Sequence, residues 1–510
     1  MLKSAQPFIS LVSFISNFSV RIVFLLIIIL SSCNQNKSDW EASFEGVTSS
    51  SSPQCTDLTG DGVLDIVMGA GGEEWKKTTS GILAVNGKNG QLIWKAKARN
   101  QIVGSAIFLD INVDKTEDII IGGRSAELQA LDGKTGKLIW EFYSKQGRLV
   151  AYDEGWHNFF NPQLVLDQDS DGIKDLLICN GGDALLAAGS KNRPIGKLLL
   201  ISGKTGKILA QDQMPDGSET YSTPVCFDCD TNQNPSFIFG SGGETQGGNL
   251  FLTDLHSLKN KTIKNAKILA SSSTKGFIAP PILADFNQDN SLDILVNQAD
   301  GTTKLIDGQS HKTVWLVKCD SAEVYSQPGL GNFYGNDNIP DVFVSYAKGT
   351  YPTYKKTINY LVDGKTGKIV SKSELKRFTY SSPLVADLDQ DGIDEIILNT
   401  VKDYQEHQQE KPYYELTIYN FAKMTEKHLG KKHYGACFAS SPWLGDLDKN
   451  GKLDVVYSGS PAAISEFPGT TFYNKPLKFL QIHHLEMSGY SAKSVKWGSY
   501  LGKNGQSIKR

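Results

Sequence analysis

Short apolar runs recur along the chain, and each run follows a segment that is rich in Asp, Asn and Gly. Continuous apolar runs of this length between turn residues are typical of strands that are buried on both faces. The pattern therefore predicts an all-β protein with one such buried strand in every repeat. The runs are residues 66–68, 119–121, 176–178, 237–239, 294–296, 342–344, 396–398 and 455–457.

An acidic pattern of nine residues leads into each apolar run. Its positions 1, 3, 5 and 9 carry oxygen-bearing side chains, and position 6 is often Gly, as in Gly172. Successive copies begin 48 to 61 residues apart, and self-similarity at such a period predicts a repeat architecture. The six complete copies hold, at positions 1, 3, 5 and 9, Asp57, Thr59, Asp61 and Asp65; Asp110, Asn112, Asp114 and Asp118; Asp167, Asp169, Asp171 and Asp175; Asp285, Asn287, Asp289 and Asp293; Asp387, Asp389, Asp391 and Glu395; and Asp446, Asp448, Asn450 and Asp454.

Two further copies of the acidic pattern are incomplete. The copy that begins at Asp228 has Ser236 where position 9 calls for an acid. The copy at residues 333–341 keeps only Asp337 and Asp341 in register. The chain therefore contains eight repeats, of which six keep the full set of oxygen-bearing side chains.

A second repeated motif lies between the acidic loops. The run Asp-Gly-Lys-Thr-Gly at residues 132–136 stands between two apolar segments, and its Asp-Gly and Thr-Gly pairs supply the positive φ angles of a tight hairpin. An acidic loop, an inner strand, a hairpin and outer strands make one four-stranded antiparallel blade of a β-propeller. We expect a single propeller over residues 46–510 with eight blades, or seven if one incomplete repeat is not a full blade. Related turns stand at residues 86–90, 202–206, 307–308 and 363–367.

These motifs resemble two known families. The acidic loops resemble the FG-GAP or VCBS repeat of integrin-α-like propellers, and residues 130–140 resemble the tryptophan-docking motif of quinoprotein, or PQQ-dehydrogenase-like, propellers. The second resemblance implies that Trp94, Trp140 and Trp315 pack between neighbouring blades. For closure of the ring, we expect residues 40–44 to pair with residues 495–497.

Closely spaced carboxylates in the loops repel one another unless a cation lies among them. A hard cation takes oxygens from positions 1, 3, 5 and 9 and a backbone carbonyl from position 7, so we expect Ca²⁺ in the six complete loops. An EF-hand is excluded because its twelfth position, a Glu, is Met68 in the first copy and Ile178 in the third. Solvated Asp-rich turns are the alternative. For the Asp228 loop the two alternatives are balanced, and no ion is expected near Phe333.

The N-terminus has the features of an exported protein. Lys3 and Arg21 precede an apolar run at residues 22–30 that is too short to span a bilayer. The following Ser31-Ser32-Cys33 resembles the lipobox of bacterial lipoproteins. This resemblance implies a signal peptide at 1–32, lipid on Cys33, and a segment at 33–45 that holds the tether and the first strand. We expect a lipoprotein of the outer membrane in the bacterial cell envelope, on its periplasmic or surface face; an uncleaved anchor at 8–30 is the alternative.

Six cysteines besides Cys33 leave the disulfide pairing open, because spacing alone does not pair them. Cys226 and Cys229 have redox-motif spacing but no helix N-terminus to lower a thiol pKa. We expect a local disulfide or buried thiols there and no catalysis. The other four are Cys55, Cys179, Cys319 and Cys437.

Composition and missing motifs limit the function. The 52 Lys and Arg residues nearly balance 55 Asp and Glu residues, for a net charge of −3, so we expect no nucleic-acid partner. The chain has no HExxH, GxSxG or Walker motif. It also lacks the adjacent Cys pair that quinoprotein dehydrogenases carry beside their cofactor, so PQQ is not expected.

The favoured function is therefore a non-catalytic interaction or scaffold module for a protein or glycan ligand. The alternative is an enzyme, PQQ-dependent and dehydrogenase-like or acting on polysaccharides, with its site in the funnel of the propeller. Trp156 and His157 are the residues expected to line that funnel. His483 and His484 lie in an alternation of apolar and polar residues, which is typical of strand faces.

Overall fold

The computed structural model describes residues 38–72, 74–143, 154–183, 185–187, 190, 192–335, 337–350, 353–375, 380–406, 409–437, 439–460, 479–502 and 505–509. Residues Trp40–Arg510 form one compact unit. The expected signal peptide and Cys33 lie outside the described residues. Within those residues, no helix is long and apolar enough to cross a membrane.

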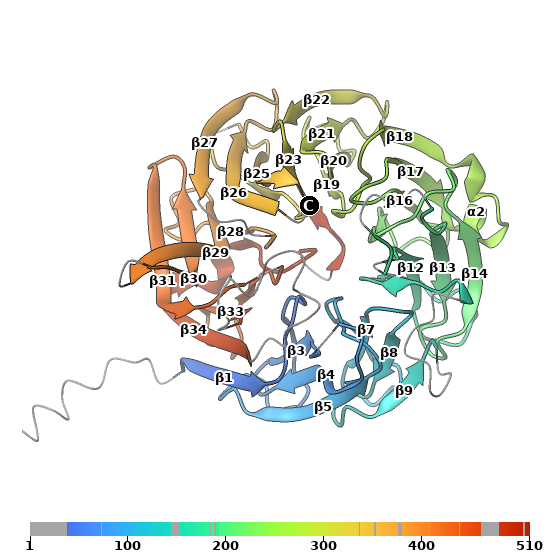
Figure 1. Cartoon of the computed structure of the whole chain (residues 1–510), viewed down its shortest axis with the longest axis horizontal. Helices are drawn as coiled ribbons and strands as arrows, with labels where there is room; N and C mark the ends of the chain where they lie inside the picture. The colour runs from blue at the N-terminus through green and yellow to red at the C-terminus, as the bar shows by residue number, and fades with distance from the viewer. Residues whose placement is uncertain are drawn as a thin grey trace, which may run out of the picture. The chain divides into compact units, whose positions relative to one another are not determined.

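Eight sheets lie in a ring, and each contains the four antiparallel strands of one blade (Figure 1). The prediction of eight four-stranded blades is confirmed, and the incomplete repeats also form blades. The first four blades are β2 (Gln54–Thr56), β3 (Asp65–Gly69), β4 (Thr78–Val85) and β5 (Leu92–Ala98); β6 (Ile107–Leu109), β7 (Asp118–Gly122), β8 (Leu128–Leu131) and β9 (Leu138–Glu141); β11 (Gln163–Val165), β12 (Asp175–Gly181), β13 (Lys197–Ile201) and β14 (Ile208–Gln213), with β10 (Asn158–Phe159) beside β12; and β15 (Val225–Cys226), β16 (Ser236–Gly240), β17 (Gly248–Asp254) and β18 (Lys267–Ser272).

The other four blades follow the same plan. They are β19 (Ile282–Ala284), β20 (Asp293–Gln298), β21 (Thr302–Ile306) and β22 (Thr313–Lys318); β24 (Gly329–Gly331), β25 (Asp341–Thr350), β26 (Thr353–Val362) and β27 (Ile369–Leu375), with β23 (Ala322–Glu323) beside β25; β28 (Leu384–Ala386), β29 (Glu395–Glu406), β30 (Gln409–Asn420) and β31 (Thr425–Tyr434); and β32 (Trp443–Gly445), β33 (Lys452–Gly459), β34 (Phe479–Ser491) and β1 (Trp40–Glu45).

The eight apolar runs form the core of the ring. Each run lies in the second strand of its blade, and its residues are at most 1% exposed. Such strands are covered on both faces because each sheet packs between two neighbouring blades. Continuous apolar runs, rather than alternating ones, are therefore the pattern that this position requires.

The predicted tryptophan docking is present between blades. The indole Nε1 of Trp94 donates a hydrogen bond to the Gly133 carbonyl of the next blade at 2.8 Å. Trp140 and Trp315 donate to Gly203 at 2.9 Å and to Gly364 at 2.7 Å in the same way. These tryptophans therefore have the structural role that the motif implied.

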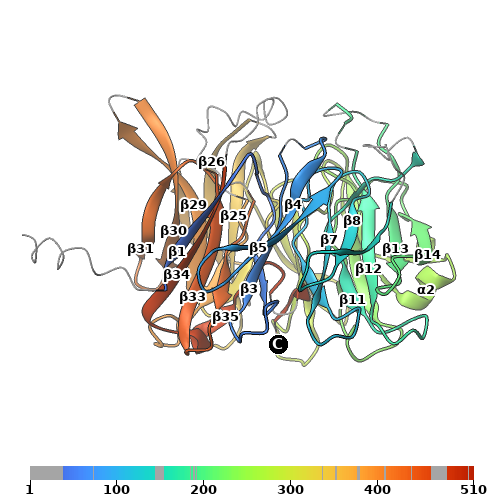
Figure 2. The ribbon, with the colours of Figure 1, turned by 90° about the horizontal axis from the view of Figure 1, so that it is seen from below.

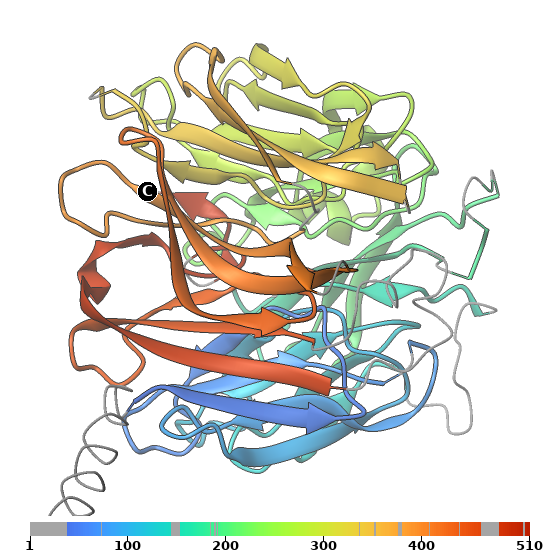
Figure 3. The ribbon, with the colours of Figure 1, turned by 60° about the vertical axis from the view of Figure 1, so that its left-hand side comes forward.

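Ring closure differs from the sequence prediction. β1 pairs with β34, with Trp40 opposite His484, and completes the eighth blade (Figure 3). The expected partner, β35 (Val495–Trp497), instead pairs with β28 of the seventh blade. The prediction was wrong because the chain after β34 turns inward: β36 (Ile508–Lys509) pairs in parallel with β19 of the fifth blade.

The two faces of the ring have different loops. The acidic loops lead into the second strands and the Gly-rich turns follow the third strands, so both lie on one face, which we call the acidic-loop face. β35 lies at this face, at the lower edge of Figure 2. The second strands end at the other face, which we call the opposite face.

Candidate metal sites

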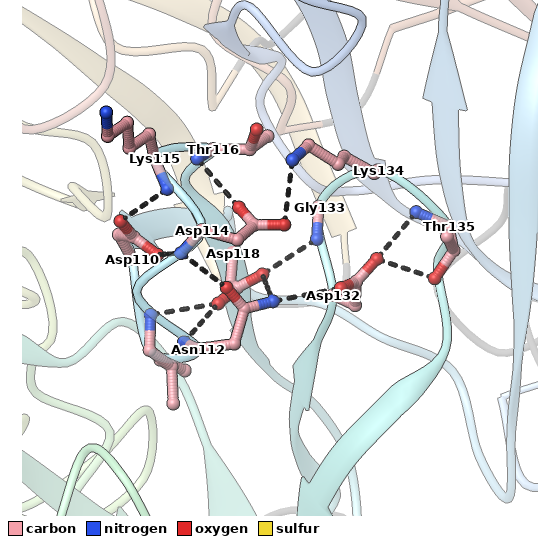
Figure 4. Close-up of polar contacts among 11 residues, drawn as sticks. Asp110, Asn112, Asp114, Lys115, Thr116, Asp118, Asp132, Gly133, Lys134 and Thr135 are labelled. Carbon is pink, nitrogen blue, oxygen red and sulfur yellow. Dashed lines mark hydrogen bonds and ion pairs between the residues drawn. The ribbon is translucent and has the colours of Figure 1, made fainter.

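In five blades, the acid at position 9 joins the acidic loop to the Gly-rich turn of its own blade. In the second blade, Asp118 Oδ2 accepts hydrogen bonds from the N–H groups of Ile111 and Asn112 at 2.9 and 3.1 Å. Its Oδ1 accepts from Gly133 N–H at 2.9 Å (Figure 4). Burial raises the pKa of Asp118. Equivalent contacts to the turn join Asp65 to Gly87, Asp175 to Gly203, Asp293 to Gly308 and Asp341 to Gly364.

The turn glycine is required by its close approach to the backbone. A Cβ on Gly133 would lie 2.1 Å from the carbonyl oxygen of Glu117, and one on Gly87 would lie 1.9 Å from that of Leu64. No side chain fits at these distances. The Gly-rich turn therefore serves the bond to the position-9 acid as well as the hairpin.

The incomplete repeats show that this contact is structural. Asp341 keeps it although its loop lacks most of the other acidic positions: Oδ2 accepts from Phe333 and Tyr334 N–H at 3.0 and 2.7 Å. In the fourth blade, where Ser236 replaces the acid, helix α2 (Leu255–Lys259) replaces the Gly-rich turn. In these two repeats the acid and the turn are kept or lost together, and the Asp341 contact forms in a loop where no ion is expected.

Backbone amides surround the acid at position 1. Asp167 accepts hydrogen bonds from Ser170 and Gly172 N–H at 2.7 and 2.8 Å. These backbone hydrogen bonds lower the pKa of Asp167, and the bond from Gly172 has the largest effect. Gly172, at position 6, has a φ of +89°. Lys115 and Asn290 occupy the same position with φ angles of 73° and 65°, so the loop shape persists without Gly.

The acid at position 5 pairs with a lysine in three blades. This acid faces a lysine of the following turn, and the three pairs are Asp61 with Lys88 at 2.8 Å, Asp114 with Lys134 at 2.8 Å, and Asp391 with Lys423 at 2.7 Å. Part of the loops' negative charge is thus balanced by lysine, which sequence reasoning had not considered.

Three loops bring the acids of positions 1, 3 and 9 together. In each, the three carboxylates offer oxygens within 4.8 Å of one another. Asp387 Oδ1 and Asp446 Oδ1 are buried and receive no hydrogen bond from any described residue. Converging carboxylate oxygens with unused lone pairs fit a hard cation such as Ca²⁺. The sets are Asp167, Asp169 and Asp175; Asp387, Asp389 and Glu395; and Asp446, Asp448 and Asp454.

Two other loops are arranged differently. Asn112 turns its amide nitrogen toward Asp132, with Nδ2 at 3.0 Å from Oδ2, and Asn287 does the same toward Asp289 at 3.0 Å. An amide N–H in this position donates to the carboxylates and offers no oxygen to an ion. These loops are bound internally, and a cation would require the amide to rotate.

A cluster of ionisable side chains on the opposite face was missed by the sequence prediction. Glu323 pairs with Lys275 Nζ at 2.8 Å and accepts a hydrogen bond from Tyr325 at 2.6 Å. Glu219 lies 3.8 Å from Arg193 Nη1, and burial raises its pKa to about 7. These residues lie at or near the ends of strands on the opposite face, outside the acidic loops and the Gly-rich turns, so neither repeated motif marks them.

The other residues that the sequence analysis singled out lie in packed parts of the structure or form structural bonds. His157 is buried, which lowers its pKa to about 4, and Trp156 lies under Lys197 Nζ, 4.0 Å from the ring centre. Cys226 and Cys229 form a local disulfide. Cys55, Cys179, Cys319 and Cys437 keep thiols outside this disulfide, and burial raises the pKa of Cys179 to about 12.

The fold and its loops define the class of the protein as an eight-bladed β-propeller with repeated acidic loops. The chain matches the FAM234A/B beta-propeller family over residues 46–242 and 244–391, which is more than half of its length. It therefore belongs to the FAM234A/B beta-propeller family. No curated protein matches the chain.

Solved propellers resemble the structure at low identity. Sqt1 of Saccharomyces cerevisiae is 9% identical, with 89% of this chain and 100% of that chain covered and a TM-score of 0.51. The quinohemoprotein alcohol dehydrogenase ADHIIG of Pseudomonas putida HK5 is 11% identical, with 89% and 76% covered and a TM-score of 0.49. BamB of Moraxella catarrhalis is 13% identical, with 70% and 79% covered and a TM-score of 0.37. At such identities the likeness shows the fold alone.

Proposed function

We propose that this propeller is a calcium-braced, non-catalytic interaction module of the bacterial cell envelope. Ca²⁺ would be held by the acidic loops, whose FG-GAP or VCBS likeness is part of this proposal. Lipid on Cys33 would anchor the propeller to the outer membrane, on its periplasmic or surface face. The ligand would be a protein or a glycan bound by loops of the opposite face.

The observation that carries the proposal is the convergence of three carboxylates in each of three loops. Burial raises the pKa of Asp175 to about 6, so the loop holds negative charge that is poorly solvated. A cation at the centre would relieve this cost and the mutual repulsion of the acids. Because the same carboxylates bond to their own blade, a bound ion would brace the fold.

Thermal unfolding of protein stripped with EDTA tests the calcium proposal. Extracellular modules bind Ca²⁺ with dissociation constants of about 10⁻⁴ to 10⁻³ M, so millimolar Ca²⁺ contributes roughly 1 kcal/mol per occupied site. We expect 2 mM CaCl₂ to raise the midpoint by several degrees and 2 mM MgCl₂ to raise it less. An identical midpoint in both salts would remove the proposal.

Matched substitutions test whether the Ca²⁺ response comes from the three converging loops. The triple variant Asp169→Asn, Asp389→Asn and Asp448→Asn changes position 3 in the three converging loops and should lose most of the Ca²⁺ response. Asp337→Asn changes an exposed acid in the incomplete loop near Phe333, where no ion is expected, and it should keep the response. Equal responses in the two variants would place any bound Ca²⁺ elsewhere.

A second candidate function is favoured by the opposite-face cluster. Glu219 is 1% exposed, its pKa is raised to about 7, and it lies beside Arg193. A general acid or base in an enzyme typically has such an environment. An enzyme that acts on acidic polysaccharides would use such a group. Glycan-array and pull-down binding without turnover would support the interaction module. Polysaccharide cleavage that is lost in Glu219→Gln would establish the enzyme.

A further inference from the structure

Two histidines and one glutamate meet where the ring closes. Glu41, His433 and His483 offer ligand atoms that all lie within 4.8 Å of one another. Glu41 on β1 stands directly opposite His483 on β34, whereas His433 lies on β31 of the neighbouring blade. Three strands of two blades therefore contribute to one cluster, and none of its members belongs to an acidic loop.

Both imidazole rings turn the same nitrogen toward one carboxylate oxygen. Nδ1 of His483 lies 3.2 Å from Glu41 Oε2, and Nδ1 of His433 lies 3.9 Å from the same atom. Gln481 donates to the other oxygen, Oε1, at 3.1 Å. A hydrogen bond accounts for the contact at 3.2 Å, but 3.9 Å is too long for one. The two Nδ1 atoms and Oε2 therefore form one close group, on two imidazole rings whose centroids are 3.8 Å apart with a tilt of 34°.

The opposite nitrogens of the two rings are held by tyrosines. His483 Nε2 lies 2.8 Å from the Tyr414 hydroxyl, and His433 Nε2 lies 2.9 Å from the Tyr457 hydroxyl. In metal sites, the ring nitrogen that does not bind the ion usually hydrogen-bonds to a neighbouring group, which fixes the ring's orientation. Both histidines have this hydrogen-bonding arrangement through their Nε2 atoms.

We propose that Glu41, His433 and His483 bind a divalent transition metal of the zinc class. Imidazole nitrogens with one carboxylate suit Zn²⁺ and its neighbours in the first transition row, whereas Ca²⁺ takes oxygen ligands. The side chain of Glu41 is 45% exposed and those of His433 and His483 are 10% and 3% exposed. The ion therefore enters from the Glu41 side, where water completes its coordination.

A metal at this point ties the first strand to two blades. β1 is held to β34 by backbone pairing, and the metal adds a link from Glu41 to β31. Burial, and to a smaller extent the positive charge of Lys431, lower the pKa of His483, and the same charge reduces the affinity for the cation. The site is independent of the proposed calcium loops and of the lipid anchor.

The test uses the full propeller, stripped of metal and then kept in 5 mM CaCl₂ so that the acidic loops are occupied. Calorimetric titration with Zn²⁺ should give one saturable site, and Co²⁺ should give visible absorption bands of a nitrogen-coordinated ion. Zn²⁺ should also raise the thermal midpoint. Absence of a saturable site for Zn²⁺ would overturn the proposal.

Variants assign the ion to the cluster. Glu41→Gln changes a half-exposed side chain and keeps the fold, and we expect it to weaken Zn²⁺ binding about tenfold or more, as His433→Ala should. His256→Ala changes a histidine on helix α2 and should bind Zn²⁺ like the wild type. If Glu41→Gln and His433→Ala both bind Zn²⁺ as tightly as the wild type, the site lies elsewhere and the proposal fails.

Discussion

The indole Nε1 of Trp40 donates a hydrogen bond to the backbone carbonyl of Gly87 at 2.8 Å, which joins the first strand of the chain to the first blade. A Cβ on Gly90 of the same turn would lie 2.5 Å from the Trp40 ring. Trp94 makes the same two contacts with Gly133 and Gly136. Trp40 is therefore a docking tryptophan, and ring closure reuses the contact that joins blades elsewhere.

Substitution of Trp40 should weaken the closure of the ring. Trp40→Phe keeps an aromatic ring but loses the hydrogen bond, and we expect it to lower the free energy of unfolding by about 1 kcal/mol. Trp40→Ala also loses the ring packing and should cost about 3 kcal/mol. Urea denaturation measures both. Leu316→Ala on β22, a side chain that is 56% exposed, serves as the control and should change little.

Asp341 offers a test of the structural role of position 9. Asp341→Asn places an amide N–H against Gly364 N–H, where the carboxylate accepts a bond at 3.3 Å. We expect a loss of about 1 to 3 kcal/mol in unfolding free energy, equal with and without Ca²⁺. Asp337→Asn, an exposed change in the same loop, is the control. A loss that appears only in Ca²⁺ would contradict the structural role.

Replacing Lys115 with glycine should stabilise the folded protein. Its φ of 73° is costly for a residue with a Cβ, and Gly stands at this position in four other loops. Lys115→Gly should raise the free energy of unfolding by about 1 kcal/mol, as measured by chemical denaturation. Lys137→Gly has no such φ to relieve and should be destabilising. The idea fails if both variants lose stability alike.

Burial of His157 predicts part of the pH dependence of stability. Its folded pKa of about 4 lies below the unfolded value of about 6.5. Between these values the unfolded chain binds more protons, so stability rises with pH through this window and is lost as the pH falls toward 4. His157→Gln should show a shallower slope in unfolding free energies measured at pH 4.5, 5.5 and 6.5. An unchanged slope would mean that His157 is not buried in its neutral form.

The repeated parts of the fold were predictable because each repeat meets the same physical demands. Residues 119–121 had to be apolar because their strand is covered on both faces. Gly133 had to be Gly because the Glu117 carbonyl lies in the space of a Cβ. Because the same constraints act in eight repeats, they produce a pattern that can be recognised in a single sequence.

Features that occur once left no such pattern. The pairing of β1 with β34 rather than β35 depends on the path that the C-terminal residues take inside the ring. His433 and His483 are 50 positions apart in the sequence, and only the packing of two blades brings them to Glu41. Lys88 and Lys134, which pair with position-5 acids, stand in the turn motif, but only the hairpin geometry shows that they reach the acidic loop.

A crystal structure grown in 5 mM CaCl₂, with anomalous differences recorded at a wavelength where calcium scatters anomalously, tests the central claim most directly. We predict peaks between the carboxylates of Asp167, Asp169 and Asp175 and in the equivalent loops at Asp387 and Asp446. The surrounding oxygens should lie about 2.3 to 2.6 Å from each peak. Well-ordered loops that hold only water at these points would contradict the account of a calcium-braced propeller.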